Sequence, residues 1–321
     1  SICLVDEKFY KDLKLSINTN QVELLIGREG LLEICKRKDV NIVLNGLVGA
    51  AGMEPTLFAL EAGVDVALSN KESLVMAGQI IKRVMKSSGT KIFPVDSEHS
   101  AIWQCLVGEK HEDIKKIILT GSGGPFRKRK LKTFNDISVD EALKHPNWNM
   151  GKKITIDSAT MMNKCLEVIE AYWLFELEPT SIDIIIHPQS IIHSMVEFND
   201  GSVKAQLGVP DMKVPIQYAL TYPSHLKSSW ERLDLLKCRD LTFHKPDYDR
   251  FPSLQLAYQA LNKAGTASAA LNLSNDYSVA KFLKHKIKFT DIYKINHSVL
   301  HNHPWIKEPN LNDLTDLDIW V

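Results

Sequence analysis

The sequence lacks the features that mark several classes of protein. Lysine plus arginine and aspartate plus glutamate both number 39, so no excess charge favours nucleic acid or an anionic membrane as a partner. No uninterrupted apolar run approaches the length of a membrane span, and no signal peptide opens the chain. The five cysteines are an odd number without a C-x-x-C pair, which indicates reduced thiols instead of disulfides or a zinc site. These absences predict a soluble protein with neither a nucleic-acid nor a membrane partner.

The fold class follows from length and from the order of predicted elements. With 321 residues, 44% of them hydrophobic, the chain is long enough for two or three domains. Predicted strands at 2–5, 40–44, 64–68 and 91–95 alternate with predicted helices at 30–38 and 72–86 and a helix with Pro55 in its first turn. This alternation is typical of a mainly parallel α/β sheet.

The later segments predict a different architecture. Strands are predicted at 115–119, 182–186, 191–198 and 202–207, with Asn199-Asp200-Gly201 joining the last two as a hairpin in an α+β region. Helices at 253–263, 267–273, 276–285 and 291–301 predict a C-terminal helical bundle. The expected division is an α/β domain at 1–95, an α+β domain at 96–221, a linker at 222–249 and a helical domain at 250–321.

One stretch, residues 157–167, combines a helix start with polar side chains suited to an anion. Residues 153–156 predict a short strand, and Ser158 is the expected N-cap of the following helix. A helix N-terminus offers unpaired N–H groups, to which Ser158, Asn163 and Lys164 add donors that suit a phosphate. Glu167 follows Asn163 by four residues, so both side chains are expected on one helix face.

Three carboxylates are candidate ligands of a divalent metal. Asp96 and Glu98 follow a predicted strand and, two residues apart in extended chain, point to the same side. With Glu167 they form a set of oxygen ligands that suits Mg²⁺ or Mn²⁺. An acidic pair before a helix also occurs merely to complement the helix dipole, and this reading of Asp96 and Glu98 alone stays open.

Several loops are candidate ligand contacts. The small residues at 46–52 let backbone approach a ligand closely, although a plain strand-to-helix turn explains most such loops. Lys71 follows the strand at 64–68, at the edge where open α/β sheets bind ligands. The glycines around Ser122 leave N–H groups and a hydroxyl for an anion.

Aromatic and histidine side chains give weaker indications. Trp148 lies in a long polar connection typical of a lid, and packing on the domain surface explains it equally well. His187, Ser190 and His193 cluster between two predicted strands, where a histidine is more often structural than catalytic.

Six segments in this order resemble 1-deoxy-D-xylulose 5-phosphate reductoisomerase. They are Asn70-Lys71-Glu72-Ser73, the Asp96-Ser97-Glu98-His99 run within 94–102, residues 122–126, His145-Pro146-Asn147-Trp148, residues 157–167 and residues 186–194. The similarity continues through Pro210-Asp211-Met212 into the helical tail and covers nearly the whole chain. The resemblance implies a homodimeric enzyme of non-mevalonate isoprenoid synthesis that depends on NADPH and on Mg²⁺ or Mn²⁺. Such an enzyme rearranges 1-deoxy-D-xylulose 5-phosphate and reduces the aldehyde to 2-C-methyl-D-erythritol 4-phosphate.

The resemblance also implies roles for individual residues. Metal binding and catalysis are expected of Asp96, Glu98 and Glu167, with Lys71 as a further catalytic residue. Substrate contacts are expected from Ser97, Ser122, His145, Trp148, Ser158, Asn163 and Lys164. Cofactor contacts are expected from Gly46, Asn70, Lys71, Glu72, Gly121, Met150, Gly151 and Met212. On this basis residues 1–95 are a partial Rossmann-like NADPH-binding domain and residues 96–221 the catalytic domain, located in the cytoplasm if bacterial or in a plastid or apicoplast if eukaryotic.

Two features depart from the family pattern. Family members open with a glycine-rich dinucleotide fingerprint, whereas Gly27-Arg28-Glu29-Gly30 has neither the spacing nor a predicted preceding strand. The chain is therefore expected to begin partway through the cofactor domain, and to bind phosphosugar and metal better than it turns substrate over. Cys165 stands where the family usually has glycine, and its side chain is expected to crowd a close helix contact beside Glu167.

Two alternatives remain open. One is a non-catalytic protein that binds a phosphosugar or a metal without a cofactor-binding unit. The other is a different NADP-dependent oxidoreductase, such as a relative of homoserine dehydrogenase. That enzyme would need the missing fingerprint and would not need the Asp96, Glu98 and Glu167 triad. Affinity for NADPH distinguishes the enzyme from the binding protein.

Overall fold

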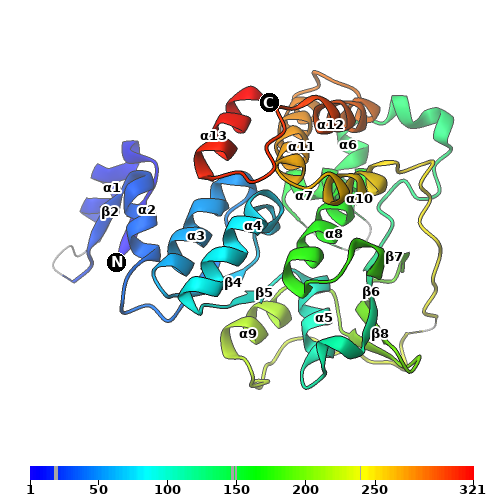
Figure 1. The fold of residues 1–321 in the computed structure, drawn as a ribbon, viewed down its shortest axis with the longest axis horizontal. Helices are drawn as coiled ribbons and strands as arrows, with labels where there is room; N and C mark the ends of the chain where they lie inside the picture. The colour runs from blue at the N-terminus through cyan, green and yellow to red at the C-terminus, as the bar shows by residue number, and fades with distance from the viewer. Residues whose placement is uncertain (18–20, 146–147, 149, 239) are drawn as a thin grey trace.

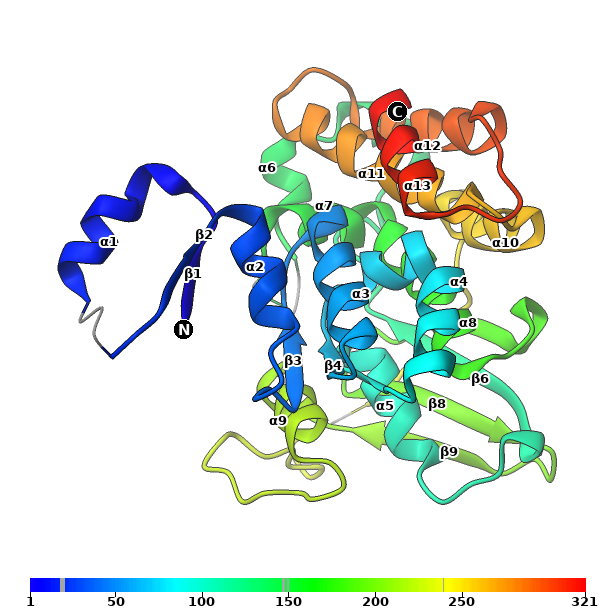
Figure 2. The ribbon, with the colours of Figure 1, turned by 60° about the vertical axis from the view of Figure 1, so that its left-hand side comes forward.

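The computed structural model describes residues 1–17, 21–145, 148, 150–238 and 240–321, whose strands form three sheets (Figure 1). In the first sheet β1 (Ile2–Leu4) runs parallel to β2 (Leu24–Ile26). Between them lie η1 (Glu7–Phe9) and α1 (Tyr10–Ser16), and α2 (Gly27–Cys35) follows. Figure 2 shows this unit at one end of the molecule. A strand thus does precede Gly27, contrary to expectation, because three residues are too few for their pattern to predict a strand.

The second sheet confirms the predicted parallel α/β unit. Its order is β3 (Ile42–Asn45), β4 (Asp65–Leu68) and β5 (Ile92–Pro94), all parallel. The connections are η2 (Gly49–Gly52) with α3 (Met53–Glu61), and then α4 (Lys71–Ser88). Because the strands are parallel, Lys71 after β4 and Asp96 after β5 emerge at the same edge.

The third sheet has the order β7-β6-β8-β9 and mixes both strand directions. β6 (Ile114–Gly121) pairs in parallel with β7 (Ile182–Ile186) and antiparallel with β8 (Ile192–Phe198). β8 and β9 (Val203–Leu207) form the predicted hairpin, in which Asp200 Oδ1 accepts from the Ser202 N–H at 2.8 Å. α5 (Ser97–Leu106) packs on β8 and β9, and α8 (Met162–Phe175) on β6 and β7. The short elements η3 (His111–Asp113), η4 (Leu131–Asp136), α6 (Val139–Ala142) and η5 (Pro179–Ser181) complete this region.

The strand predicted at 153–156 is wrong, because these residues belong to the helix α7 (Lys152–Thr160). The apolar and polar residues alternate there, but helical contacts decide the conformation. Lys153 pairs with Asp157 at 2.9 Å, four residues on, and Thr155 Oγ1 donates to the carbonyl of Gly151 at 2.8 Å. Ser158 consequently lies near the C-terminal end of a helix and is not an N-cap.

The C-terminal half confirms most of the predicted helices. α9 (Lys213–Thr221) precedes residues 222–249, where the described part contains no helix or strand beyond a bridge between His244 and Ile186. α10 (Ser253–Lys263), α11 (Ala267–Leu283), α12 (Phe289–Asn302) and the unpredicted α13 (Leu311–Trp320) follow. The two helices predicted at 267–273 and 276–285 are one, since Asn275 between them is buried and donates to Asp157 Oδ1 at 2.7 Å.

Two large apolar cores hold these layers together. One joins the third sheet and α8 to α10, α11 and α12, with Ile117, Leu166 and Leu254 among its fully buried members. The other lies between β4, α3 and α4 and receives Leu273 of α11 and Leu314 of α13. α11 therefore contributes to both cores. Among the described residues, none of the helices has the length and apolar character to cross a membrane.

Candidate active site

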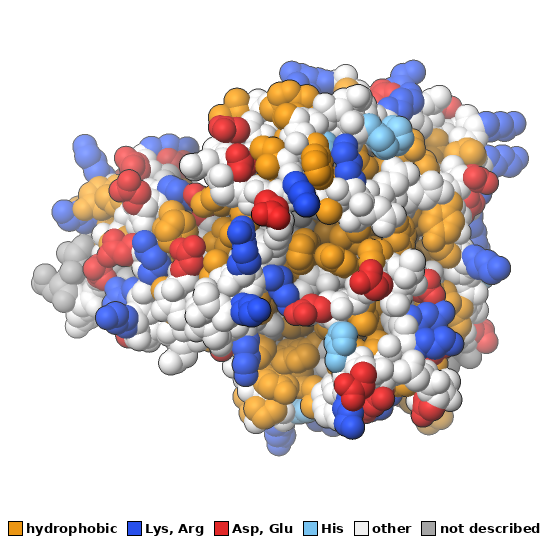
Figure 3. Space-filling model, in the orientation of Figure 1, with side chains coloured by type: hydrophobic (Ala, Val, Ile, Leu, Met, Phe, Trp, Pro, Cys, Tyr) orange, Lys and Arg blue, Asp and Glu red, His pale blue; other side chains and the backbone are white. Residues whose placement is uncertain are grey.

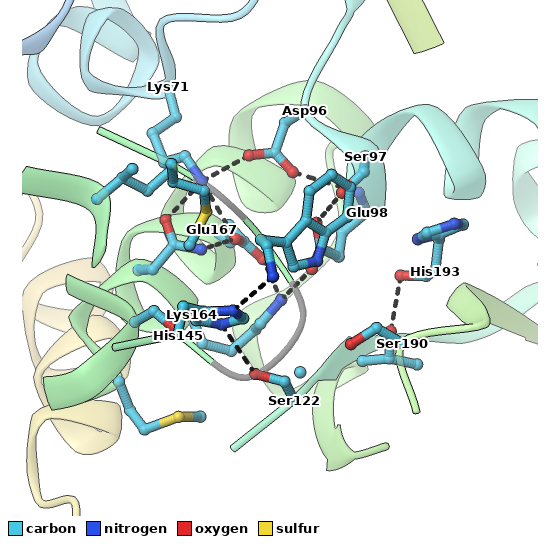
Figure 4. A pocket seen from close by; sticks show the side chains of 18 of the residues that line it. Lys71, Asp96, Ser97, Glu98, Ser122, His145, Lys164, Glu167, Ser190 and His193 are labelled. Atoms are coloured by element: carbon cyan, nitrogen blue, oxygen red, sulfur yellow. Dashed lines mark hydrogen bonds and ion pairs between the residues drawn. The ribbon is translucent and has the colours of Figure 1, made fainter. Parts of the chain in front are cut away.

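A cavity of about 280 Å³ lies where the carboxyl ends of β4, β5 and β6 meet the start of α8 (Figure 4). Its size suits a small-molecule ligand. Most residues predicted for the site line it, namely Lys71, Asp96, Ser97, Glu98, Gly121, Ser122, His145, Trp148, Met150, Ser158, Asn163, Lys164, Glu167 and Met212.

Three carboxylates converge in this cavity from two segments of the chain. Asp96 is the N-cap of α5, its Oδ1 accepting from the Glu98 N–H at 3.2 Å, and Glu98 lies in the first turn. Glu167 comes from α8 and is fully buried. One oxygen of each carboxylate lies within 4.8 Å of the other two. Hard oxygen ligands at this spacing fit Mg²⁺ or Mn²⁺, with water or substrate completing the shell.

Two buried ammonium groups balance these carboxylates. Lys71 Nζ lies 2.5 Å from Asp96 Oδ2 and 3.1 Å from Glu167 Oε1, and donates to Asn163 Oδ1 at 2.8 Å. Lys164 Nζ lies 2.8 Å from Glu98 Oε1 and also pairs with Glu167 Oε2. Three negative and two positive groups leave one net negative charge, which favours a further cation.

The charge states follow from burial and from these pairs. Burial acts to lower the pKa of Lys71, but Asp96 and Glu167 raise it well above its usual value. Burial acts to raise the pKa of Asp96, yet Lys71 holds it well below its usual value. The pKa of Lys164 is likewise raised by Glu167 and Glu98 against the effect of burial. Burial and Glu98 raise the pKa of Glu167, opposed by the two lysines.

Behind the carboxylates, His99 of α5 fixes their positions. Its Nε2 lies 2.9 Å from the backbone carbonyl oxygen of Glu167, and its Nδ1 lies 3.3 Å from Asp96 Oδ1 and 3.2 Å from Glu170 Oε2. Asp96, His99 and Glu170 form a second cluster with the spacing of metal ligands. His99 and Glu170 are fully buried and do not line the cavity, so their role is to hold Asp96 and Glu167.

Groups suited to an anion line another part of the cavity. Ser122 Oγ accepts from the Gly124 N–H at 3.2 Å and lies 3.3 Å from His145 Nε2. His145 Nδ1 accepts from the Trp148 N–H at 2.9 Å, so a neutral ring carries its proton on Nε2, toward Ser122. Burial lowers the pKa of His145 and favours this neutral ring. Ser158 lines the cavity as well.

The helix N-terminus at the cavity is that of α8. This helix starts after Met161, whose φ of 61° ends α7, so Asn163 and Lys164 lie in its first turn. Ser158 approaches the glycine-rich loop instead, because a Cβ on Gly124 would lie 2.7 Å from the Ser158 carbonyl oxygen. Only glycine permits this approach. Ser158, Asn163 and Lys164 therefore line the same cavity, as predicted, but Ser158 comes from α7 and the other two from α8.

Four residues expected to contact a cofactor do not line the cavity. Asn70 is the buried N-cap of α4, and its Nδ2 donates to the carbonyls of residues 47 and 49 at 2.8 and 2.9 Å. Glu72 is ion-paired with Lys153 at 2.9 Å. Gly46 and Gly151 are exposed, and no atom lies within 4 Å of a Cβ built on either. Asn70 and Glu72 therefore anchor the surrounding loops, while the two glycines leave backbone accessible.

The cavity also contains residues without a predicted site role, which are Ser69, Thr120, Gly123, Ile154, Met161, Ser190, Ile192 and His193. Thr120 Oγ1 lies 2.7 and 2.8 Å from the carbonyl oxygens of Ile192 and His193, which joins β6 to β8. The rings of His193 and Trp148 lie 6.5 Å apart. The antiparallel pairing of β8 with β6 brings His193 here, whereas the sequence gives only the weak signal of a histidine cluster between two strands.

Cys165 contacts α10 rather than the carboxylates. It is fully buried in the core that α8 shares with α10. Burial raises the pKa of the thiol, against the effect of a hydrogen bond with the backbone of Ala257. The Cys165 side chain is thus accommodated between these two helices.

Comparisons with known proteins agree along the chain. Family models match residues 1–78 (1-deoxy-D-xylulose 5-phosphate reductoisomerase), 92–175 (the C-terminal domain of that protein) and 207–321 (DXP reductoisomerase C-terminal domain). The 1-deoxy-D-xylulose 5-phosphate reductoisomerase of Chloroherpeton thalassium is 52% identical over 99% of this chain and 82% of its own length. That of Ruminiclostridium cellulolyticum is 51% identical over 94% of this chain and 79% of its own length.

Solved structures show the same fold. A DOX-P reductoisomerase in complex with NADPH, fosmidomycin and magnesium superposes with a TM-score of 0.92 at 42% identity, covering 99% of this chain and 83% of the other. The Zymomonas mobilis 1-deoxy-D-xylulose 5-phosphate reductoisomerase in complex with NADPH superposes with a TM-score of 0.92 at 41% identity. The match covers 99% of this chain and 82% of the other.

Proposed function

The chain belongs to the 1-deoxy-D-xylulose 5-phosphate reductoisomerase family, and we propose from this that its cavity performs the family's reaction. It rearranges 1-deoxy-D-xylulose 5-phosphate and reduces the aldehyde with NADPH to 2-C-methyl-D-erythritol 4-phosphate, in non-mevalonate isoprenoid biosynthesis. The observation that carries this assignment is the meeting of Asp96, Glu98 and Glu167 with hydroxyl, amide and ammonium groups suited to a phosphate in one cavity.

Asp96, Glu98 and Glu167 would hold the divalent ion. When bound, the ion supplies positive charge to the ketone and neighbouring hydroxyl oxygens of the substrate. Lys71 spans Asp96 and Glu167, so a divalent ion on these carboxylates would release its ammonium to donate to a substrate oxygen at the same point. His99 keeps the carboxylates in place through Asp96 and the Glu167 backbone.

Ser122, Ser158, Asn163, Lys164 and His145 would bind the phosphate. Lys164 now neutralises Glu98 and Glu167, and a divalent ion on these carboxylates would release its ammonium toward the phosphate. The binding energy of this unreactive end then positions the reacting end of the substrate. Ser97, whose hydroxyl donates to Glu98 Oε2 at 2.6 Å, would contact the substrate's oxygens.

Trp148 and Met150 would close the cavity and exclude water from the path of hydride transfer. NADPH supplies the hydride. Gly121, Met150 and Met212 line the cavity and are placed to contact its nicotinamide end, with Gly46 and Gly151 offering accessible backbone farther out. Asn70 and Glu72 would act on the cofactor indirectly, by holding the 46–52 loop and the start of α4.

Oxidation of NADPH, measured with 1-deoxy-D-xylulose 5-phosphate and Mg²⁺ or Mn²⁺, tests this proposal. We expect substrate-dependent and metal-dependent oxidation that yields 2-C-methyl-D-erythritol 4-phosphate. Binding of the phosphosugar and metal with no NADPH oxidation would instead identify a non-catalytic binding protein.

We further propose that the enzyme is a homodimer. β9 is the edge of the third sheet and has no strand on its outer side among the described residues, which leaves it available for pairing. Apolar side chains are also exposed in the 222–249 segment, among them Leu226, Leu235 and Leu236. Figure 3 shows further hydrophobic side chains gathered where α9 lies. Leu220 of α9 and Tyr222 directly after it are also exposed.

The domain division is also a proposal. Residues 1–95 would be the partial Rossmann-like NADPH-binding domain, 96–221 the catalytic domain, 222–249 a linker and 250–321 a helical bundle. The continuous core between the third sheet and α10 to α12 makes the catalytic domain and the helical bundle pack as one body. The free thiols of all five cysteines support a reducing compartment, the cytoplasm of a bacterium or a plastid or apicoplast.

A further inference from the structure

A second cavity, of about 260 Å³, lies behind the glycine-rich loop of the active site. Gly123 and Met161 line both cavities. The other walls come from the residues after this loop and from the segment before α10. We propose that this second cavity binds a small organic phosphate or diphosphate with an apolar body, apart from the reacting centre. This inference goes beyond the proposed function. The binding experiment that tests it gives a result whether or not the proposed function is correct.

Positive side chains dominate the rim of this second cavity. It is lined by Arg127, Lys128, Lys245 and Arg250, with the ring of His244 and a single carboxylate, Asp247. Among the described residues, only Arg250 of these four cations has an ion pair, with Nη1 3.4 Å from Asp247 Oδ2. Three cations without ion pairs around one small cavity favour an anionic ligand. Arg250 Nε adds a buried donor without a hydrogen-bond partner.

The floor of the second cavity is apolar. Ile186, Phe251, Leu254 and Met161 line it, and each is buried. An inorganic anion gains nothing from such a floor, whereas an ester removes its hydrocarbon part and this surface from water together. The pairing of a cationic rim with an apolar floor therefore selects an amphipathic phosphate over free phosphate.

The wall between the two cavities is a single loop. Gly123 has a φ of 80°, and a Cβ there would lie 2.9 Å from Ile186 Cγ2 and 3.2 Å from Arg127 Cδ. The loop backbone thus rests directly on two residues of the second cavity. Ser122, the residue before Gly123, lines the active site. A ligand that moves Arg127 or Ile186 consequently changes the affinity of the active site for phosphate, and the effect is reciprocal.

Methyl NMR of isoleucine-labelled protein separates the two cavities, because Ile186 lines only the second and Ile192 only the first. In a titration with benzyl phosphate, we expect the methyl shift of Ile186 to saturate. Its dissociation constant should differ from the one given by Ile192. Inorganic phosphate should bind more weakly at Ile186, and benzyl alcohol should leave it unchanged.

The double variant Lys128→Gln/Lys245→Gln removes two of the rim charges. We expect the affinity for benzyl phosphate measured at Ile186 to fall by about tenfold or more, while the affinity measured at Ile192 is unchanged. Lys130→Gln, at an exposed lysine outside the cavity, is the matched control and should behave as the unaltered protein. The proposal is overturned if Ile186 does not respond, if it follows the Ile192 curve, if the double variant binds as before, or if inorganic phosphate binds as tightly as the ester.

Discussion

Glu167 has no contact with solvent, and Lys71, Asn163 and Lys164 all donate to its carboxylate. Glu167→Gln keeps the size of the side chain but deletes one of three charged ligands, so we expect a folded protein whose affinity for Mg²⁺ or Mn²⁺ falls by at least about tenfold. Titration calorimetry measures this. Glu176→Gln, at an exposed carboxylate just beyond α8, is the control. Unchanged metal affinity in Glu167→Gln would show that the metal lies elsewhere.

Ser158 and Lys164 reach the phosphate region from different helices, and their removal should differ. Ser158→Ala deletes only a hydroxyl, so we expect inorganic phosphate and substrate to bind more weakly by about 1–3 kcal/mol. Lys164→Ala should weaken phosphate binding similarly and also change metal affinity, because it leaves Glu98 and Glu167 without this partner. Calorimetric titration of both variants, with exposed Ser87→Ala as the control, measures these effects. Equal phosphate affinity in all three variants would refute a phosphate site here.

At the scale of the elements, one ammonium group joins three helices. Lys153 Nζ of α7 lies 2.9 Å from Glu72 Oε1 of α4, 2.9 Å from Asp157 Oδ2 and 3.0 Å from Asp276 Oδ1 of α11. Glu72 is adjacent to Lys71, so this network sets the position of the helix that delivers Lys71 to the metal ligands. Burial raises the pKa of Asp276 to about 6, and the attraction of Lys153 opposes this only in part.

This pKa makes the stability of the protein depend on pH. The folded pKa of Asp276 lies above its ordinary value of 3.8, so the stability it contributes is complete below pH 4 and is lost as the pH rises through about 6. Asp276→Asn imitates the protonated form. We expect the variant to gain up to about 2–3 kcal/mol in unfolding free energy relative to the unaltered protein between pH 4 and 7.

Denaturant unfolding at several pH values checks this prediction. Asp316→Asn, at an exposed residue of α13, is the control and should follow the unaltered protein at each pH. If the unfolding free energies of Asp276→Asn and of the unaltered protein differed by the same amount at every pH between 4 and 7, the assigned protonation of Asp276 would be wrong.

At the scale of the whole molecule, the proposed dimer makes exposed leucines testable. Leu236 is 97% exposed beside other exposed leucines, so Leu236→Glu should place a charge in the interface and shift the sedimenting species from dimer to monomer. Leu15→Glu is the matched control, since Leu15 is 88% exposed but lies on α1, at the far end of the molecule (Figure 2). A dimer unaffected by Leu236→Glu would place the interface elsewhere.

Local sequence signals were sufficient to predict several elements of this fold. The parallel strands β3 to β5, the β8–β9 hairpin and the bounds of α10 follow from periodicity and turn residues, which act over a few positions. Asp96, Glu98 and Glu167 could be grouped because two of them follow one strand and the third suits the same cation. Parallel strands bring their carboxyl ends together, so Lys71 was placed as well.

Other features depend on partners that are distant in sequence and could be recognised only in the folded protein. Residues 153–156 have the alternation of a strand, but Lys153 finds Glu72 and Asp276 only when the segment is helical and buried among α4 and α11. Asn275 interrupts the apolar pattern of α11, yet its hydrogen bond to Asp157 keeps the helix continuous. His193 reaches the active site through the pairing of β8 with β6. Periodicity records the spacing of side chains, whereas these positions are fixed by the charges and amides that folding buries together.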